Sequence, residues 1–121
     1  MNLSKENQEL LTGLVKILKE KKCEEIKILD LSKIHNYLNF FIIATSKTEA
    51  QARSVSKDAE KLIKSFQLKV SKNLQSTLSS NRSGWILLDY GEVCIHIMNS
   101  ETRKYYDLER LWGDAEEVVL A

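Results

Sequence analysis

The chain has 121 residues, of which 43% are hydrophobic and 29% are charged, and its formal net charge is +1. This length suits one domain spanning residues 1–121, and the composition is that of a soluble globular protein rather than a disordered one. No apolar run approaches the ~20 residues that cross a bilayer. Two cysteines do not make a disulfide scaffold, and the first residues lack an apolar signal core, so we expect a cytoplasmic protein.

Hydrophobic periodicity predicts two helices and two strands in the first half of the chain. Ser4 can cap a helix that runs to about Lys21. A strand over 26–31 follows, then a polar connection, and then a strand over 40–45 whose apolar character on both faces predicts a central position. A second helix begins near Ser46 or Thr48, because Ser46 and Glu49 have the spacing of a capping box. The side of this helix predicted to face the sheet carries Ala52, Val55, Ala59, Leu62 and Phe66.

The second half of the chain predicts further strands and a short C-terminal helix. Residues 67–70 are interpreted as a third strand, and residues 71–83, rich in Ser and Asn, as a loop. Two strands over 85–98 join at Tyr90-Gly91, and Leu108 and Leu111 are expected to anchor the last helix. The strand–helix–strand order over 40–70 predicts a parallel pair, and the hairpin adds an antiparallel one. We therefore expect the α/β class, with a mixed sheet of about five strands flanked by helices.

The hairpin over 85–98 has two faces of different character. With a two-residue turn, Asp89 lies opposite Glu92, Leu87 opposite Cys94, and Trp85 opposite His96. One face is then aliphatic core: Ile86, Leu88, Val93, Ile95 and Ile97. The other face mixes apolar and polar side chains: Trp85, Leu87, Asp89, Glu92, Cys94, His96 and Met98. Because Asp89 and His96 need partners when buried, this face is either covered by matching polar groups or open for binding a protein.

Motifs for catalysis or metal binding are absent from the sequence. Cys94 and His96 share a strand face, but a packed thiol and a satisfied imidazole are favoured over a nucleophile pair or half a metal site. The chain has no glycine-rich phosphate loop, no Gly-x-Ser-x-Gly and no His-Glu-x-x-His. We predict no catalytic residue, no metal site and no cofactor.

Charge is unevenly distributed along the chain. Residues 61–88 hold five bases and no acid, whereas residues 101–121 hold six acids and three bases. This pattern would orient the protein on a mixed surface of RNA and protein, but an ordinary solvated surface explains it as well and is favoured. Tyr105, Tyr106 and Trp112 could stack on bases, although Asp107 and Glu109 beside them would repel phosphate.

Two strings carry a resemblance to a known family. They are Trp85-Ile-Leu-Leu-Asp-Tyr-Gly-Glu-Val-Cys-Ile-His-Ile97 and Arg103-Lys-Tyr-Tyr-Asp-Leu-Glu-Arg-Leu-Trp-Gly-Asp114. With Cys23–Asp30 and Phe41–Thr45, they resemble the ribosomal silencing factor (Iojap) family over nearly the whole chain after the first helix. The chain departs from the family pattern at 46–51, which lacks the usual Gly and His, and at 76–81, which lacks a Glu-Gly pair.

The resemblance implies a fold like that of nucleotidyltransferases, without their catalytic motifs or activity. It also implies a translational repressor that binds the large ribosomal subunit, mainly through the large-subunit protein conventionally numbered fourteen. Such a factor sterically blocks joining of the small subunit under nutrient limitation or in stationary phase, and the free protein forms homodimers. The alternatives are a nucleotidyltransferase-fold enzyme and a general RNA-binding module.

Three groups of residues are candidates for these contacts. The predicted partner-binding residues are Trp85, Leu87, Asp89, Tyr90, Ala44 and Thr45. Residues assigned to either contact or scaffold are His96, Arg103, Tyr106, Asp107, Glu109 and Trp112. Basic residues that could touch neighbouring ribosomal RNA are Lys69, Lys72 and Arg82.

Overall fold

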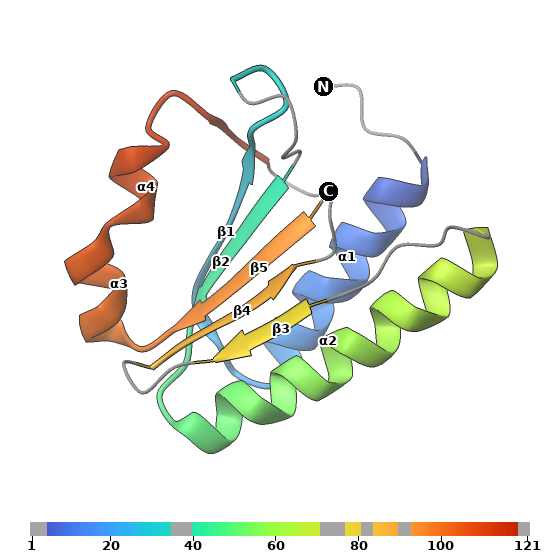
Figure 1. Ribbon diagram of the computed structural model, residues 1–121, viewed down its shortest axis with the longest axis horizontal. Helices are drawn as coiled ribbons and strands as arrows, with labels where there is room; N and C mark the ends of the chain where they lie inside the picture. The colour runs from blue at the N-terminus through green and yellow to red at the C-terminus, as the bar shows by residue number, and fades with distance from the viewer. Residues whose placement is uncertain (1–4, 35–39, 71–76, 81–83, 90–92, 119–121) are drawn as a thin grey trace.

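The computed structural model describes residues 5–34, 40–70, 77–80, 84–89 and 93–118, which form a mixed sheet with helices on both faces (Figure 1). The strands lie in the order β3-β4-β5-β2-β1-β6. Their bounds are β1 Glu24–Asp30, β2 Phe40–Thr45, β3 Thr77–Ser80, β4 Trp85–Asp89, β5 Val93–Met98 and β6 Glu116–Glu117. Neighbouring strands are antiparallel except β2 and β5, which are parallel. The predicted α/β class with a mixed sheet is confirmed, with the two-residue β6 as an additional edge strand.

Strand β2 occupies the centre of the sheet, between β5 and β1, as its sequence predicts. All six of its residues are buried. Ile42 and Ala44 point into the larger hydrophobic core, whereas Phe41 and Ile43 point into a second core on the other face of the sheet. This strand has water on neither face, which explains its continuous apolar composition.

Helices α1 (Lys5–Glu20) and α2 (Glu49–Val70) pack side by side against one face of the sheet (Figure 1). Leu10, Leu11, Leu14 and Leu18 of α1 are buried, as the helical spacing predicts. A Cβ atom on Gly13 would lie 2.8 Å from Leu62 Cδ2, so glycine allows the two helices to approach closely. Helix α2 buries the predicted side, except that Ile63 is fully buried and Leu62 only partly.

Of the two predicted starts of α2, Thr48 is confirmed and Ser46 is wrong, and the predicted C-terminal end is also wrong. The cap is Thr48, whose Oγ1 accepts from the Gln51 backbone N–H at 3.0 Å, while Gln51 Oε1 accepts from the Lys47 N–H at 2.7 Å. Ser46 is buried and its N–H donates to the Met98 carbonyl. The predicted strand over 67–70 is wrong, because α2 continues through it to Val70. Ala59, Ile63 and Phe66 keep the helical spacing up to this point, and the helix outweighs a short β-prone run.

The parallel pair is therefore different from the one predicted. Strand β2 pairs with β5, from Phe40 opposite Val93 to Thr45 opposite Met98, and the connection between them holds α2, β3 and β4. Strand β3 lies within the stretch 71–83 interpreted as a loop, so that interpretation is wrong for residues 77–80; the rest of the stretch lies outside the described residues.

The hairpin of β4 and β5 keeps its predicted faces in a different register. Trp85 lies opposite Met98 rather than His96, and Asp89 lies opposite Cys94, which leaves residues 90–92 between the strands. A shift of two residues leaves every side chain on its original face. The aliphatic face is buried against α1 and α2 as predicted: Ile86, Leu88, Val93, Ile95 and Ile97.

Two short helices, α3 (Ser100–Tyr106) and α4 (Leu108–Leu111), lie on the side of the sheet away from α1 and α2 (Figure 1). Asn99 caps α3, since its Oδ1 accepts from the Thr102 N–H at 2.8 Å, and Asp107 ends it in a left-handed conformation with φ 47°. Leu108 is buried as predicted, but Leu111 is 70% exposed, so its predicted anchoring role is wrong. Among the described helices, none combines the length and apolar composition needed to cross a bilayer.

Candidate protein-docking face and the adjoining pocket

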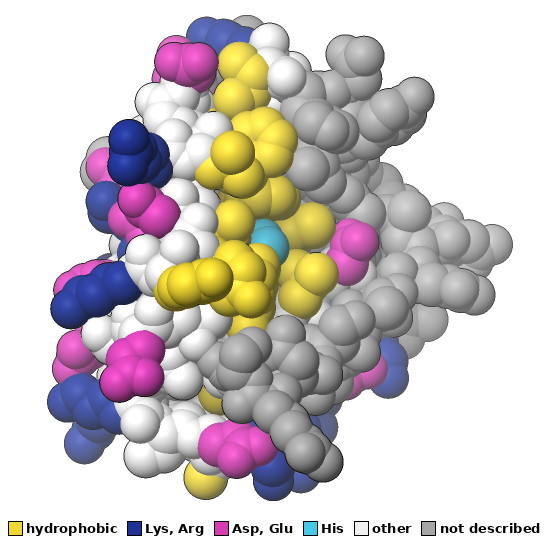
Figure 2. All heavy atoms as spheres, turned by 60° about the vertical axis from the view of Figure 1, so that its left-hand side comes forward, with side chains coloured by type: hydrophobic (Ala, Val, Ile, Leu, Met, Phe, Trp, Pro, Cys, Tyr) yellow, Lys and Arg dark blue, Asp and Glu magenta, His cyan; other side chains and the backbone are white. Residues whose placement is uncertain are grey.

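Aromatic and apolar side chains gather on the sheet face opposite α1 and α2. Figure 2 shows them as one band, with Lys, Arg, Asp and Glu side chains along one side of it. We call this surface the aromatic face and define it by Phe41, Trp85, Leu87, His96, Tyr106 and Trp112. Below these residues lies the second core, formed by Leu29, Leu31, Ile43, Cys94, Met98 and Leu108. A continuous apolar band beside charged groups has the composition of a protein-docking surface.

Trp85 is held in place from two sides. Its ring centroid lies 4.8 Å from that of Tyr106, and its Nε1–H donates to His96 Nδ1 at 3.1 Å. The indole is half-buried, so part of it remains available for contact. A large aromatic side chain fixed before binding loses little conformational entropy when a partner docks, which is typical of a binding hot spot.

The rings of this face form a connected row. Phe41 packs edge-on against His96, with centroids 4.6 Å apart, and against Trp112, with centroids 5.8 Å apart. Tyr106 in turn contacts Tyr105, which is 83% exposed. Because each ring contacts the next, the row spans β2, β4, β5 and the α3–α4 segment as one packed unit.

Burial keeps both titratable groups of β5 neutral at neutral pH. Desolvation lowers the pKa of His96 to about 4, although the charge of Asp89 opposes this shift. Burial, and then the nearby Asp89, raises the pKa of Cys94 to about 12, and the thiol lies 3.5 Å from Asp89 Oδ1 as a donor. Cys94 is thus a packed thiol, as the sequence favours, and its low thiolate content makes it a poor nucleophile. Among the described residues, no three His, Cys, Asp or Glu side chains gather in a way that could hold a metal ion.

Arg103 ties α3 and α4 to the sheet. Its guanidinium is buried, with Nη1 donating to Thr45 Oγ1 at 2.8 Å and Nε donating to Glu109 Oε1 at 2.7 Å. Glu109 also pairs with Lys27 at 3.1 Å. The hydrogen bond from Arg103 is the main cause that lowers the pKa of Glu109. These contacts direct the charged groups of Arg103 and Glu109 at each other and at the sheet, as is expected of a scaffold.

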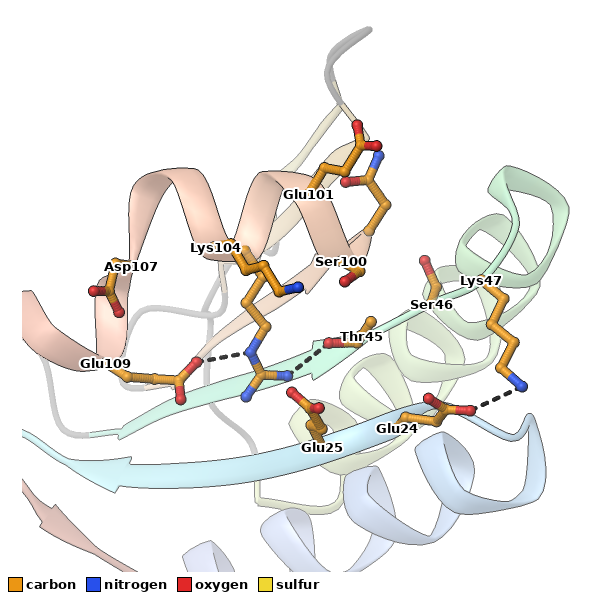
Figure 3. Close-up of a pocket in the computed structure, with 12 residues that line it drawn as sticks. Glu24, Glu25, Thr45, Ser46, Lys47, Ser100, Glu101, Lys104, Asp107 and Glu109 are labelled. Carbon is orange, nitrogen blue, oxygen red and sulfur yellow. Dashed lines mark hydrogen bonds and ion pairs between the residues drawn. The ribbon is translucent and has the colours of Figure 1, made fainter.

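A polar pocket of about 760 Å³ adjoins this scaffold at the carboxyl ends of β2 and β5. Figure 3 shows the Lys47–Glu24 ion pair on one side of the pocket. On the other side it shows the hydrogen bonds that Thr45 and Glu109 accept from Arg103. Its charged lining consists of the acids Glu24, Glu25, Glu101, Asp107 and Glu109 and the bases Lys47, Arg103 and Lys104. Ligands of α/β sheets often bind at this end of the strands. The surplus of carboxylates nevertheless makes the pocket a poor site for a phosphate group.

The structure brings together only some of the residues predicted to bind a partner. Trp85, Leu87 and Asp89 lie on the same face of β4, as predicted. Thr45 is buried and bound to Arg103, and Ala44 is fully buried in the larger core, facing α1 and α2. Tyr90 and two of the predicted RNA contacts, Lys72 and Arg82, lie outside the described residues, and the third, Lys69, lies within α2.

Sequence reasoning missed Phe41 as a member of this face. The signal was available, because Phe40 and Phe41 are adjacent in a strand and must point to opposite faces. It also did not decide whether Tyr106 and Asp107 belong to the contact surface or to the scaffold. Tyr106 stacks on Trp85, whereas Asp107 is exposed and supplies the left-handed turn between α3 and α4.

Comparisons with known proteins match the whole described fold. The family model described as "Ribosomal silencing factor during starvation" matches residues 4–121. The ribosomal silencing factor RsfS of Halalkalibacterium halodurans is 32% identical over 114 residues, which cover 94% of each chain. A crystal structure of a Chromobacterium violaceum protein superposes with a TM-score of 0.75 at 27% identity, covering 94% of this chain and 91% of that one. A mouse relative named "Mitochondrial assembly of ribosomal large subunit protein 1" is 23% identical over 82% of this chain and 43% of its own length.

Proposed function

Because the chain belongs to the ribosomal silencing factor family, we propose that it represses translation by binding the large ribosomal subunit and sterically blocking the small subunit. The protein acts as a binding partner, and the block requires no chemical step. The expected site of action is the cytoplasm, where subunits join.

The observation that carries this proposal is the preorganised, partly exposed aromatic face. The opposite face of the sheet is covered by α1 and α2. The aromatic face instead carries Trp85, held by Tyr106 and His96, and part of Tyr106 is exposed. Fixed aromatic side chains supply much of the affinity in protein interfaces of standard size, which bury about 800 Å² on each partner. A domain of this length is roughly 30 Å across, which is enough to obstruct a contact between two subunits.

Two considerations support the large subunit as the partner. The name of the mouse relative refers to that subunit. The family resemblance implies the protein conventionally numbered fourteen as the main contact. We assign Trp85, Leu87 and Asp89 to the centre of the docking surface and leave out Ala44, whose side chain is fully buried.

A sedimentation experiment tests the proposal. Purified large subunits are incubated with the protein and sedimented, small subunits are then added, and joined ribosomes are measured. The wild-type protein is expected to co-sediment and to reduce joining. Co-sedimentation that leaves joining intact would reject the steric mechanism.

A matched pair of variants locates the binding face. Leu87→Glu adds one negative charge to the aromatic face, and Ser65→Glu adds one to an exposed position of α2 on the opposite side. Leu87→Glu should lose both binding and the block, whereas Ser65→Glu should keep both. Trp85→Ala should weaken binding by roughly 30-fold or more, as expected for a hot-spot aromatic residue. If all three variants bind large subunits as tightly as wild type, the contact lies elsewhere on the protein.

The same preparation distinguishes the two alternative functions. A nucleotidyltransferase would bind a nucleotide with Mg²⁺ in the absence of ribosomes. A general RNA-binding module would bind unrelated RNAs as well as the large subunit, with a steep loss of affinity at higher salt.

A further inference from the structure

The contact between Trp85 and His96 fixes the position of the imidazole proton. Trp85 Nε1–H can only donate, so His96 Nδ1 must accept and carries no proton. Burial keeps the ring neutral at neutral pH. A neutral imidazole has one N–H, and here it must be on Nε2. His96 therefore presents a hydrogen-bond donor at Nε2.

This donor has no acceptor among the described residues. His96 is 5% exposed, and its Nε2 is buried without a hydrogen-bond partner. A buried donor left without a partner destabilises the folded protein, so native structures rarely keep one without a reason. The imidazole also lies at the middle of the aromatic face, in contact with Phe41 and Trp85 (histidine is cyan in Figure 2).

We propose that His96 Nε2–H is the specific polar contact of the docking face and donates to a neutral oxygen of the ribosomal protein partner, a main-chain carbonyl or side-chain amide. This inference rests on the proposed function and adds the chemistry that the partner must offer. The apolar band supplies contact area, and the single donor at its centre selects the partner and its register.

The surroundings of His96 favour a neutral acceptor over an anion. Asp89 shares this face of β4 and lies close enough for its charge to act on the imidazole. A carboxylate or an RNA phosphate entering here would be repelled by Asp89 within a poorly hydrated site. A main-chain carbonyl or amide oxygen carries no net charge and accepts from an imidazole N–H at ordinary distances. Because His96 is nearly covered, neighbouring side chains must rearrange slightly to admit the acceptor, as is common at interfaces.

The donor also acts against incorrect partners. A purely apolar surface docking on this face would bury Nε2–H without an acceptor, and an unpaired donor in an interface weakens binding. The free protein can therefore expose an aromatic band while disfavouring nonspecific association through it.

Two substitutions separate the two nitrogens of His96. In His96→Asn, the amide oxygen can replace Nδ1 as the acceptor for Trp85, but nothing reaches the position of Nε2. In His96→Gln, the longer side chain places an amide N–H near Nε2, but the acceptor for Trp85 is lost. Affinity for purified large subunits should fall about tenfold or more in the Asn variant and clearly less in the Gln variant. Thermal unfolding of both variants establishes that they are folded.

The outcomes discriminate between this inference and the proposed function. If wild type binds large subunits and the Asn variant binds equally well, or if Gln is as weak as Asn, the role of Nε2 is overturned while the proposed function stands. If wild type does not bind, both are overturned. Nitrogen NMR of the imidazole in the free wild-type protein tests the premise without any variant: we expect a protonated Nε2 and an unprotonated Nδ1, and the reverse would reject the inference.

Discussion

Arg103 and Thr45 are joined by a 2.8 Å hydrogen bond from Nη1 to Oγ1, which ties α3 to the end of the central strand β2. The two residues are 58 positions apart in the chain. Because Arg103 and Tyr106 lie on the same short helix, this bond also fixes how Tyr106 rests on Trp85. The scaffold around Arg103 thus positions the face proposed to bind the ribosome.

Removing the Arg103 guanidinium should strongly destabilise the protein. Arg103→Met leaves Thr45 without its donor and removes the buried partner of a partly exposed ion pair with Glu109. The loss of both contacts should cost about 2 kcal/mol, to be measured by urea denaturation. Arg110→Met, at an exposed position on α4, is the control and should change stability by less than about 0.5 kcal/mol. Equal effects of the two substitutions would contradict the scaffold role, as would an unchanged pKa of Glu109 in Arg103→Met, where we expect that pKa to rise.

The two leucines of α4 should differ sharply in their contribution to stability. Leu108 is 9% exposed in the second core, and Leu108→Ala should lower the free energy of unfolding by about 2 to 4 kcal/mol. Leu111 is 70% exposed, and Leu111→Ala should change it by less than about 0.5 kcal/mol. Denaturant midpoints of the two variants decide the matter. A large loss for Leu111→Ala would show that α4 packs in another orientation.

Gly84 should resist substitution because of its backbone conformation and its neighbour. It has φ +78°, a Cβ atom there would lie 2.9 Å from Asn99 Cγ, and Asn99 caps α3. Gly84→Ala should therefore cost about 2 kcal/mol, from the left-handed conformation and the disturbed cap together. A double-mutant cycle with Asn99→Ala measures the coupling free energy between the two positions. If the losses in stability from the two substitutions simply add, the contact between Gly84 and the cap does not contribute to the cost.

His96 should make stability depend on pH between about 6.5 and 4. Its pKa in the folded protein is about 4, below the ordinary value of 6.5, so the unfolded chain takes up the proton first as the pH falls. Stability is then fully present above pH 6.5 and decreases towards pH 4, by on the order of 3 kcal/mol in total.

Replacing His96 by a residue that does not titrate separates its contribution to stability from that of the carboxylates, which also titrate in this range. The measurement is the free energy of unfolding of wild type and His96→Phe at several pH values, with His35→Gln as the control for the other histidine. As the pH falls from 6.5 to 4, the free energy of unfolding of wild type should fall relative to that of His96→Phe. Parallel pH profiles would show that His96 is not buried in its neutral form.

The sequence predicted well those elements whose environment is uniform along their length. Residues 40–44 are all apolar and Thr45 ends the run, because β2 is covered on both faces, so even the bounds are correct. Residues 67–70 were assigned to a strand because four residues are too few to distinguish a period of two from a period of 3.6. The hairpin register was wrong by two residues, yet its faces were right, because the face of a strand residue depends only on whether its position is odd or even.

The candidate site divides in the same way. Trp85, Leu87 and Asp89 could be placed on one face from the alternation within a single strand. The stacking of Tyr106 on Trp85 could not, because it depends on how α3 is oriented by distant residues. Leu111 was misplaced for a local reason: α4 has only four residues, Leu108–Leu111, so a spacing of three residues does not place both leucines on its covered side.

The parallel pairing of β2 with β5 has a consequence for the order of events during synthesis. Phe40 pairs with Val93, so β2 cannot pair with β5 until 53 more residues have been synthesised. Contacts of such long separation form slowly, and until β5 emerges one edge of the most apolar strand has no strand beside it. The nascent chain can complete its sheet only when nearly all of it has left the ribosome that is translating it.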